Sequence, residues 1–337
     1  MEIGVYTAVL HDRDLRSALA TAKELGLEGV EVNAGGFVGT PHLPVDAVLS
    51  SDDARDEYLG LFEEAGVHLN GLNVNGNALH VNPAVRAKHS GDLVRSIALA
   101  ERLGQTRVVC MSGLPEGAPG AVAPTWIVNP WDSSWLDALE HQWSLAVPYW
   151  RELDRRAADA DVHLCIEMHP QNLVFNPSTL ERLVEQTGAT HVGAEMDPSH
   201  LFWQQIDPVA AIRHLGPLVR HAAAKDVRIN PAAAIHGVLD DRFRRLRPDE
   251  DRVGLGTGPG TDGEHYVNEW PTDSAWDFVA VGNGHGVDFW TEFLRALHEV
   301  DPEMKVNIEH EDTALGRIEG LQVAASTLAQ AREAAGV

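Results

Sequence analysis

The sequence predicts a (β/α)8 barrel, an α/β fold, and three observations predict it. Short apolar runs recur along the chain, and amphipathic segments that end in glycine or a polar turn precede most of them. A segment expected to be helical follows each run. Eight runs begin near residues 2, 28, 68, 106, 162, 191, 218 and 304. Eight parallel strands joined by helices are the number that closes such a barrel.

The first repeat shows the pattern clearly. A strand is predicted at Ile3–Thr7, an amphipathic helix at Asp14–Leu25 and a second strand at Val30–Asn33. Gly26 follows the helix, at a position where glycine commonly ends one. An open, doubly wound sheet is the alternative, but it would place a glycine-rich phosphate loop after the first strand. The stretch Gly4-Val-Tyr-Thr-Ala-Val contains no such loop.

Later repeats follow the same order of helix, turn and buried strand. The turns before the next five strands are expected at Gly66, Gly104, Asp161, Gly188 and Gly216. A final helix at about 318–333 closes the ring.

Two connections are too long for simple loops. They span about 112–134, which is rich in Pro, Gly and Trp, and about 227–285. Both follow predicted strands, so in a barrel both lie over the mouth at the carboxyl ends of the strands, as lids or partner-binding elements. We expect a single domain over residues 1–337 that carries these two insertions.

Composition excludes several classes of partner. Lys and Arg total 26 against 50 Asp and Glu, for a formal net charge of -24. A chain this acidic is not suited to nucleic acid or to anionic membranes. No leader or membrane-spanning run is recognised, so we expect a cytoplasmic protein. Cys110 and Cys165 fall inside predicted strands, where packed, reduced thiols are expected.

Acidic and imidazole side chains stand where predicted strands end. The run Val162–Pro170 ends in Glu167 and His169, Asp197 follows the next strand, and Glu309 follows the last. The carboxyl ends of barrel strands meet at one mouth, so these acids should converge. Three neighbouring carboxylates repel one another unless a cation holds them, and oxygen-rich sites suit divalent Mn, Mg, Co or Zn. The alternative is that each carboxylate pairs separately with an arginine or a helix end.

A fourth ligand is expected from the seventh strand, Leu218–Asp226. His221, Ala223 and Lys225 share its inward face if the strand is regular.

In this order and spacing, the motifs resemble the sugar phosphate isomerase/epimerase family with the xylose isomerase-like barrel. The resemblance covers essentially the whole chain. The matching pieces are Asn75-Gly-Asn-Ala-Leu-His80, Glu167-Met-His-Pro170, Asp197-Pro-Ser-His-Leu-Phe-Trp203 with Asp207-Pro208, His221 to Lys225-Asp226, Trp276-Asp-Phe with Gly284-His-Gly-Val-Asp-Phe-Trp290, and Ile308-Glu-His-Glu-Asp312.

The resemblance implies one divalent ion, often manganese, held by Glu167, Asp197, a histidine of the seventh strand and Glu309. Family members usually read His-x-His-x-Lys-Asp on that strand, with the second histidine on the metal. This chain has Ala223 at that position. We assign His221 as the fourth ligand; an ion with fewer protein ligands, or His200 in that place, are the alternatives.

Roles follow from the chemistry of such a site. Glu167 and Glu309 are expected to take and return a proton beside a substrate carbonyl, with His169 as an acid or hydrogen-bond donor. His200, Lys225 and His285 are expected to bind substrate oxygens. Two further acids follow Glu309. These are Glu311 and Asp312, and both are expected at the rim of the mouth.

The expected function is a metal-dependent isomerase or epimerase acting on a sugar or polyol, either alone or as a homo-oligomer. The resemblance extends to catalytic subunits of C-glycoside deglycosidases, lyases that eliminate the aglycone from a 3-oxo glycoside and work with a small β-rich partner subunit. Tryptophans in or beside the long loops favour that alternative: Trp126, Trp131, Trp135, Trp203, Trp270, Trp276 and Trp290. A non-catalytic sugar-binding barrel is the third reading, and the net charge speaks against the related endonuclease branch.

Overall fold

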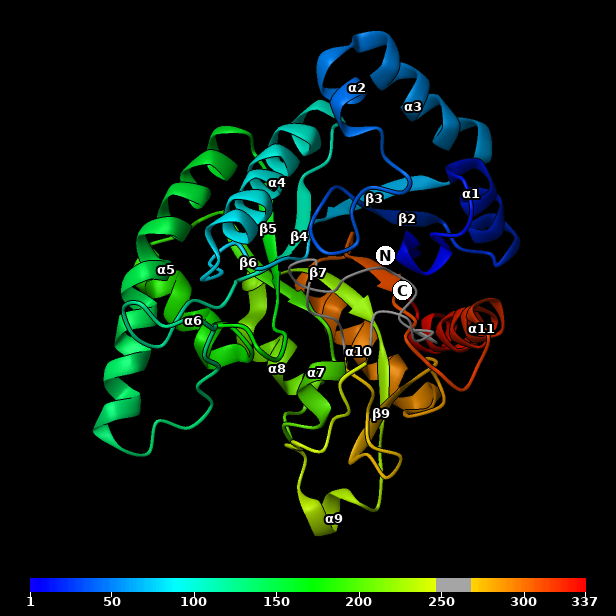
Figure 1. The fold of residues 1–337 in the computed structure, drawn as a ribbon. Helices are drawn as coiled ribbons and strands as arrows, with labels where there is room; N and C mark the ends of the chain where they lie inside the picture. The colour runs from blue at the N-terminus through cyan, green and yellow to red at the C-terminus, as the bar shows by residue number, and fades with distance from the viewer. Residues whose placement is uncertain (247–267) are drawn as a thin grey trace. The chain divides into compact units, whose positions relative to one another are not determined.

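A computed structural model describes residues 1–246 and 268–337 of the chain. Eight parallel strands form a closed barrel in the order β1-β10-β7-β6-β5-β4-β3-β2 (Figure 1). Each strand begins at the expected position or one residue later, which confirms the predicted fold class. The barrel strands are β1 (Glu2–Tyr6), β2 (Gly29–Asn33), β3 (His68–Asn73), β4 (Arg107–Met111), β5 (His163–Glu167), β6 (Val192–Met196), β7 (Val219–Ala224) and β10 (Lys305–Ile308).

Helices connect the strands, and polar residues begin several of them. Asp14 accepts a hydrogen bond from the Ser17 amide at 2.8 Å at the start of the first long helix, as expected for an N-cap. The helices are η1 (Thr7–Leu10), α1 (Leu15–Glu24), α2 (Val45–Ser50), α3 (Asp52–Ala65), α4 (Pro83–Arg102), α5 (Ser133–Asp159), α6 (Pro177–Thr187), α7 (Ser199–Phe202), α8 (Pro208–Leu215), η2 (Gly216–Leu218), α9 (Ala233–His236), α10 (Val287–Val300) and α11 (Arg317–Ala335).

The chain divides into two compact units. Unit 1 contains Met1–Glu31, Gly60–Asn70 and Met196–Val337, and unit 2 contains Val32–Leu59 and Gly71–Glu195. The expectation of a single domain over residues 1–337 stays a prediction.

In unit 1, β10 pairs with both β1 and β7, and α10 packs against α11 and α8. Trp290 and Phe293 of α10 are fully buried in this packing. Burying aromatic side chains of this size removes a large apolar area from water, which makes α10 a main contributor to the core of the unit.

The second predicted insertion contains a hairpin that the sequence did not reveal. Strand β8 (Asp226–Ile229) pairs antiparallel with β9 (Trp276–Val279), and α9 follows β8 in the connection between them (Figure 1). Asp226 is fully buried and accepts hydrogen bonds from the amides of Val227, Gly282, Gly284 and His285. This carboxylate therefore fixes the backbone where the insertion leaves and rejoins the unit. Residues 247–267 of the insertion lie outside the described residues.

Unit 2 contains the first predicted insertion. Residues 112–132 form no helix or long strand before α5 begins at Ser133. Trp150 of α5 is fully buried, and its Nε1 donates to the Ser112 carbonyl at 3.1 Å. The long helix is thereby joined to the residue that follows β4.

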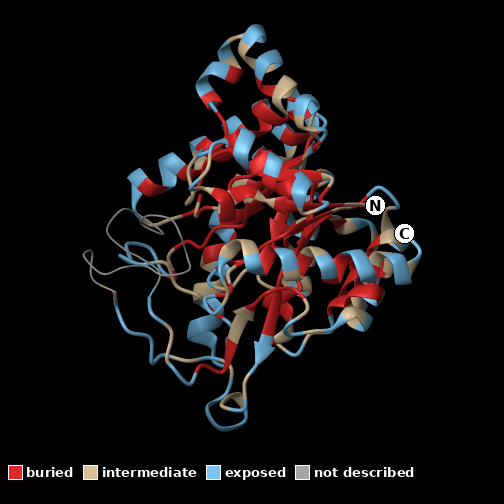
Figure 2. Cartoon of the chain, turned by 90° about the vertical axis from the view of Figure 1, so that its right-hand side faces the viewer, coloured by how far each residue is buried: buried red, intermediate tan, exposed pale blue. Residues whose placement is uncertain are grey.

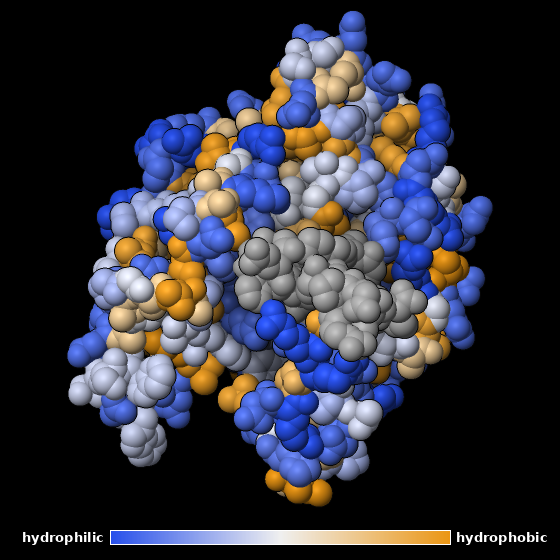
Figure 3. Space-filling model, viewed as in Figure 1, coloured by the Kyte–Doolittle hydropathy of each residue, from blue (hydrophilic) through white to orange (hydrophobic). Residues whose placement is uncertain are grey.

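Burial follows the expected pattern for this fold. Buried residues run along the strands and the inner faces of the helices, and exposed residues cover the outer helix faces (Figure 2). The face seen in Figure 3 is mostly hydrophilic, in keeping with the acidic composition, and its apolar side chains are scattered in small groups. Among the described residues, none of the helices combines the length and the apolar character that a membrane span requires.

Candidate active site

The three predicted carboxylate ligands stand at or just beyond the carboxyl ends of barrel strands. Glu167 is the last residue of β5, Asp197 directly follows β6 and Glu309 directly follows β10. His169 follows β5, His200 lies in α7, Lys225 separates β7 from β8, and His285 precedes α10; His221 alone lies within a strand, β7. The strand ends are where active sites collect in this fold.

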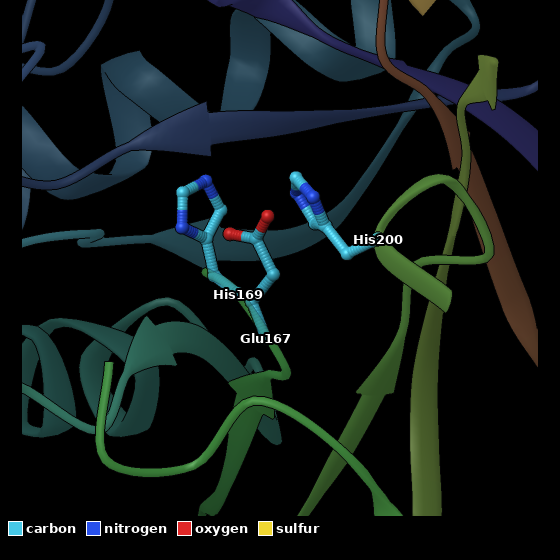
Figure 4. Close-up of side chains that lie close together, drawn as sticks. All are labelled: Glu167, His169 and His200. Atoms are coloured by element: carbon cyan, nitrogen blue, oxygen red, sulfur yellow. The ribbon is translucent and has the colours of Figure 1, made fainter. Parts of the chain in front are cut away.

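In unit 2, Glu167 is 2% exposed and Asn75 holds its carboxylate. Asn75 Nδ2 donates to Glu167 Oε2 at 2.5 Å. His169 lies near it, and its Nδ1 lies 2.7 Å from the Pro170 carbonyl oxygen, which makes Nδ1 the donor. Figure 4 shows both side chains extending from the segment that ends β5, in the same view as His200. The second nitrogen of His169, Nε2, is the one that the Pro170 contact leaves for other partners.

The carboxylates of unit 2 also affect a cysteine. Burial raises the pKa of the Cys110 thiol well above its usual value, and the nearby Cys165, Glu195 and Glu167 raise it further. Both cysteines are buried and neither forms a disulfide, in line with the packed, reduced thiols that the sequence predicted. The Cys110 thiol therefore stays protonated and acts as a packing group rather than a nucleophile.

In unit 1, Asp197 and His200 form a buried pair, each 1% exposed. His200 Nε2 lies 3.3 Å from Asp197 Oδ2, and the Ser199 amide donates to Asp197 Oδ1 at 2.8 Å. The turn into α7 is thus built around the Asp197 carboxylate, which has both oxygens oriented by neighbours in the sequence.

Lys225 carries its ammonium into a group of carboxylates in the same unit. Its Nζ lies 3.1 Å from Glu309 Oε2, 2.8 Å from Glu311 Oε1 and 3.9 Å from Asp197 Oδ2. Asp197 and Glu309 therefore face the same positive charge. This arrangement shows that the unit can stabilise a cation between these two acids.

His221 lies deeper than these groups, two residues before Ala223 in β7. Its Nε2 lies 2.7 Å from Glu31 Oε2, and Asn307 Nδ2 lies 3.0 Å from both atoms. Asn70 in turn donates to Asn307 Oδ1 at 3.0 Å. His221 belongs to this buried network; its assignment as the fourth metal ligand stays a prediction.

His285 and Asp312 have structural contacts within unit 1. His285 Nδ1 lies 2.7 Å from Asp226 Oδ1, and its ring stacks on Phe202 with 3.8 Å between centroids. Asp312 is buried and accepts hydrogen bonds from the amides of Ala280 and Ala314; its expected place at the rim stays a prediction. Substrate binding by His285 stays a prediction.

Sequence reasoning missed three features of this region: the role of Glu31, the contacts of Phe278, and the contact between Lys225 and Glu311. Glu31 carried a usable signal, because an acid within the apolar run Val30–Asn33 has no packing role. Phe278 lies in the motif Trp276-Asp-Phe, but that motif gave no indication of its contacts. Its ring lies 4.7 Å from Lys225 Nζ and 5.8 Å from the His200 ring, contacts that depend on the unpredicted hairpin.

The described residues include groups whose side chains could hold a metal ion. One consists of Glu167, Asp197 and Glu309, which were predicted as ligands; the others contain Glu31 with Glu195 and His221, and Glu167 with His169 and His200. The first group offers only carboxylate oxygens, the ligands that Mg²⁺ and Mn²⁺ prefer. The acids at the strand ends therefore fit a hard divalent ion.

The strand order, the helical crossovers and the acids at the strand ends together define the class of protein. The chain belongs to the xylose isomerase-like TIM barrel family, whose model matches residues 19–333.

Particular relatives agree with this class. The chain is 33% identical over 336 residues to the uncharacterized protein YfiH of Bacillus subtilis (strain 168), covering 98% of this chain and 99% of that protein. A solved L-ribulose 3-epimerase matches with a TM-score of 0.61 and 16% identity, covering 99% and 97% of the two chains. A xylose isomerase-like barrel from Mycobacterium smegmatis in complex with magnesium matches at 0.64 and 14%, covering 99% and 97%. At these identities the two solved structures show a shared fold.

Proposed function

We propose that this chain is a divalent-metal-dependent enzyme of the isomerase or epimerase type, which moves a proton beside a carbonyl group of a sugar or polyol. The observation that carries the proposal is the placement of Glu167, Asp197 and Glu309 at the ends of β5, β6 and β10. The likeness to an L-ribulose 3-epimerase and to a magnesium-bound barrel supports it.

The proposed ligands are Glu167, Asp197 and Glu309, with His221 as the candidate fourth. A divalent ion bound there supplies positive charge that polarises a substrate carbonyl and acidifies the adjacent C–H. Manganese is the ion we expect, and magnesium, cobalt and zinc are the alternatives.

The protein's own groups then account for proton movement. Glu167 and Glu309 extend from different strands, β5 and β10, so one takes a proton and the other returns one. His169 acts as an acid or hydrogen-bond donor toward a substrate oxygen. The Lys225 ammonium and the His200 imidazole bind hydroxyl or carbonyl oxygens and neutralise charge that develops there.

The burial of several tryptophans favours this proposal over aglycone elimination. The tryptophans that favoured a glycoside are in part packing groups: Trp203, Trp276 and Trp290 are buried, and the first two stack on each other with 5.7 Å between centroids. Trp131 and Trp135 remain exposed on the segment before and at the start of α5. The support for a bulky aromatic aglycone is correspondingly smaller than the sequence suggested.

The test is proton exchange with solvent. The Mn²⁺-loaded protein is incubated with a panel of ketoses and aldoses in deuterated water, and we expect deuterium at the carbon beside the carbonyl by NMR. Glu309→Gln should lower the exchange rate by at least about 10²-fold, because it removes a proposed base and a proposed metal ligand together. Loss of activity after removal of metal is the matched control.

Two outcomes would contradict the proposal. Release of a free aglycone from a 3-oxo C-glycoside, without exchange into any free sugar, would replace it with elimination. Sugar binding with no exchange, and with Glu167→Gln indistinguishable from wild type, would make the chain a binding protein.

A further inference from the structure

Lys225 has an unusually acidic setting for a single ammonium. Its side chain is 4% exposed, and within unit 1 it contacts Glu309, Glu311 and Asp197 at 3.1, 2.8 and 3.9 Å. A fourth neighbour is aromatic, because Nζ also lies 4.7 Å from the centre of the Phe278 ring. The shortest of the carboxylate contacts is to Glu311, which has no part in the proposed metal site.

The carboxylates around Lys225 differ in kind. Asp197 and Glu309 are buried and are proposed ligands of a divalent ion, whereas the Glu311 side chain is 32% exposed. An ammonium and a divalent cation repel each other and compete for the same carboxylate oxygens. A lysine this close to two metal ligands would weaken metal binding unless another group bound its ammonium and reduced its pairing with those ligands.

Glu311 and Phe278 are placed to do this. Glu311 follows Glu309 by two residues, and in an extended segment such residues point the same way. Phe278 comes from β9, and the face of its ring favours a cation. The backbone beside Lys225 is fixed, since four amides donate to the next residue, Asp226. Only the lysine side chain is left to move between the two sets of carboxylates.

We propose that Glu311, together with the Phe278 ring, is a positioning residue that draws the Lys225 ammonium away from Asp197 and competes with Glu309 for it: Nζ lies 2.8 Å from Glu311, 3.1 Å from Glu309 and 3.9 Å from Asp197. The inference rests on the metal site of the proposed function and deepens it. With an ion on Asp197 and Glu309, Lys225 keeps its contacts with Glu311 and Phe278 and points its ammonium at the bound substrate. The insertion that carries β9 thereby contributes to the site through one aromatic side chain.

The test is a double-mutant cycle on Mn²⁺ affinity, measured by calorimetry without substrate. Glu311→Gln should weaken Mn²⁺ binding by about tenfold, the lower end of effects seen when a supporting residue is lost. Lys225→Met should tighten binding. In the Lys225→Met background, Glu311→Gln should change the affinity by less than about threefold, because only a screened surface charge is then removed.

Asp277→Asn is the matched control. Asp277 is next to Phe278 in β9, but its carboxylate contacts Arg228 and Asn230 and not Lys225. It should leave Mn²⁺ affinity within about twofold. Equal weakening by Glu311→Gln in both backgrounds would overturn the inference, because Glu311 would then act only as bulk negative charge.

A second measurement separates this inference from the proposed function. If wild type binds no Mn²⁺, the proposed metal site fails. The inference is then judged from crystal structures of metal-free wild type and Glu311→Gln. We expect Lys225 Nζ to move into hydrogen-bond distance of Asp197 Oδ2 in the variant. An unchanged Nζ position would overturn the positioning role of Glu311.

Discussion

At the scale of single residues, a hydrogen bond from the Asn75 side chain, in the same unit, orients the Glu167 carboxylate. Asn75 Nδ2 donates to Glu167 Oε2 at 2.5 Å, and Asn75 follows β3 while Glu167 ends β5. A fixed donor to one carboxylate oxygen orients the other oxygen and lowers the cost of arranging a ligand when metal binds. Asn75 therefore supports the proposed metal site from a neighbouring strand end.

Asn75→Ala should weaken Mn²⁺ binding by about 10–100-fold, the range reported for groups that orient metal ligands. Asn77→Ala is the matched control in the same loop, because Asn77 contacts the backbone of Leu114 and Leu79 rather than a carboxylate. Calorimetric titration of both variants provides the comparison. Equal affinities for the two variants would mean that loop order, and not the Glu167 contact, matters.

The sequence was sufficient to place the acids, because a strand's end is visible as the point where an apolar run stops. It did not give their partners. Lys225 contacts Glu311, and His221 contacts Glu31, because side chains from distant strands meet inside unit 1. No local sequence pattern indicates contacts between side chains that are so far apart in the chain.

At the scale of elements, two glycines in neighbouring strands make room for a buried polar side chain. A Cβ built on Gly29 of β2 would lie 2.3 Å from Asn70 Oδ1, and one on Gly4 of β1 would lie 2.4 Å from Asn307 Oδ1. Both asparagines belong to the network that includes His221 and Glu31. The small residues in these strands are thus required by the buried network, not by a turn.

Gly29→Ala should destabilise the protein by about 1–3 kcal/mol, the usual cost of overpacking a buried position. Gly91→Ala is the opposite case, since Gly91 is exposed in α4 and an added Cβ would meet nothing within 4 Å apart from adjoining residues and the helix's own backbone. That change should stabilise by about 0.5–1 kcal/mol, because alanine favours helix. Urea denaturation measures both; destabilisation by Gly91→Ala, or none by Gly29→Ala, would contradict the packing described.

The hairpin of β8 and β9 is the element that the sequence did not predict. Its strands are four residues each, and residues 230–275 separate them. A hairpin is recognised from two alternating runs joined by a short turn, so this pair had no signal. The barrel strands were predictable because helix, turn and apolar run repeat many times.

At the scale of the whole molecule, stability should depend on pH through a buried histidine. Burial lowers the pKa of His89 below its ordinary value of 6.5, and the neighbouring Lys88 adds to the effect. The Asn77 amide also donates to His89 Nδ1 at 3.0 Å, which requires that nitrogen to be unprotonated. The unfolded chain therefore binds a proton more readily than the folded one, and stability falls as the pH decreases through this range.

The free energy of unfolding should consequently be lower at about pH 5.5 than at about pH 7.5. In His89→Gln, whose side chain does not titrate but keeps an acceptor for Asn77, the difference between the two pH values should be smaller. Urea denaturation at both pH values measures it. An identical pH dependence in wild type and variant would show that His89 is not a source of acid sensitivity.

Metal binding should depend on the folded state of the whole chain, because the proposed ligands come from strand ends far apart in the sequence. An ion that binds the folded chain but not the unfolded chain should raise the free energy of unfolding. The increase should be about 2.7 kcal/mol when the free ion concentration is 100 times the dissociation constant. Thermal or urea unfolding with and without Mn²⁺ should show this increase, and magnesium at the same concentration provides the comparison between ions.

The most direct measurement is the number of Mn²⁺ ions bound per chain, by elemental analysis after dialysis, in wild type and in Glu167→Gln, Asp197→Asn and Glu309→Gln. We predict one ion per chain in wild type and a loss of binding in each folded variant. Wild-type protein that retains no Mn²⁺, or variants that retain as much as wild type, would contradict the metal site.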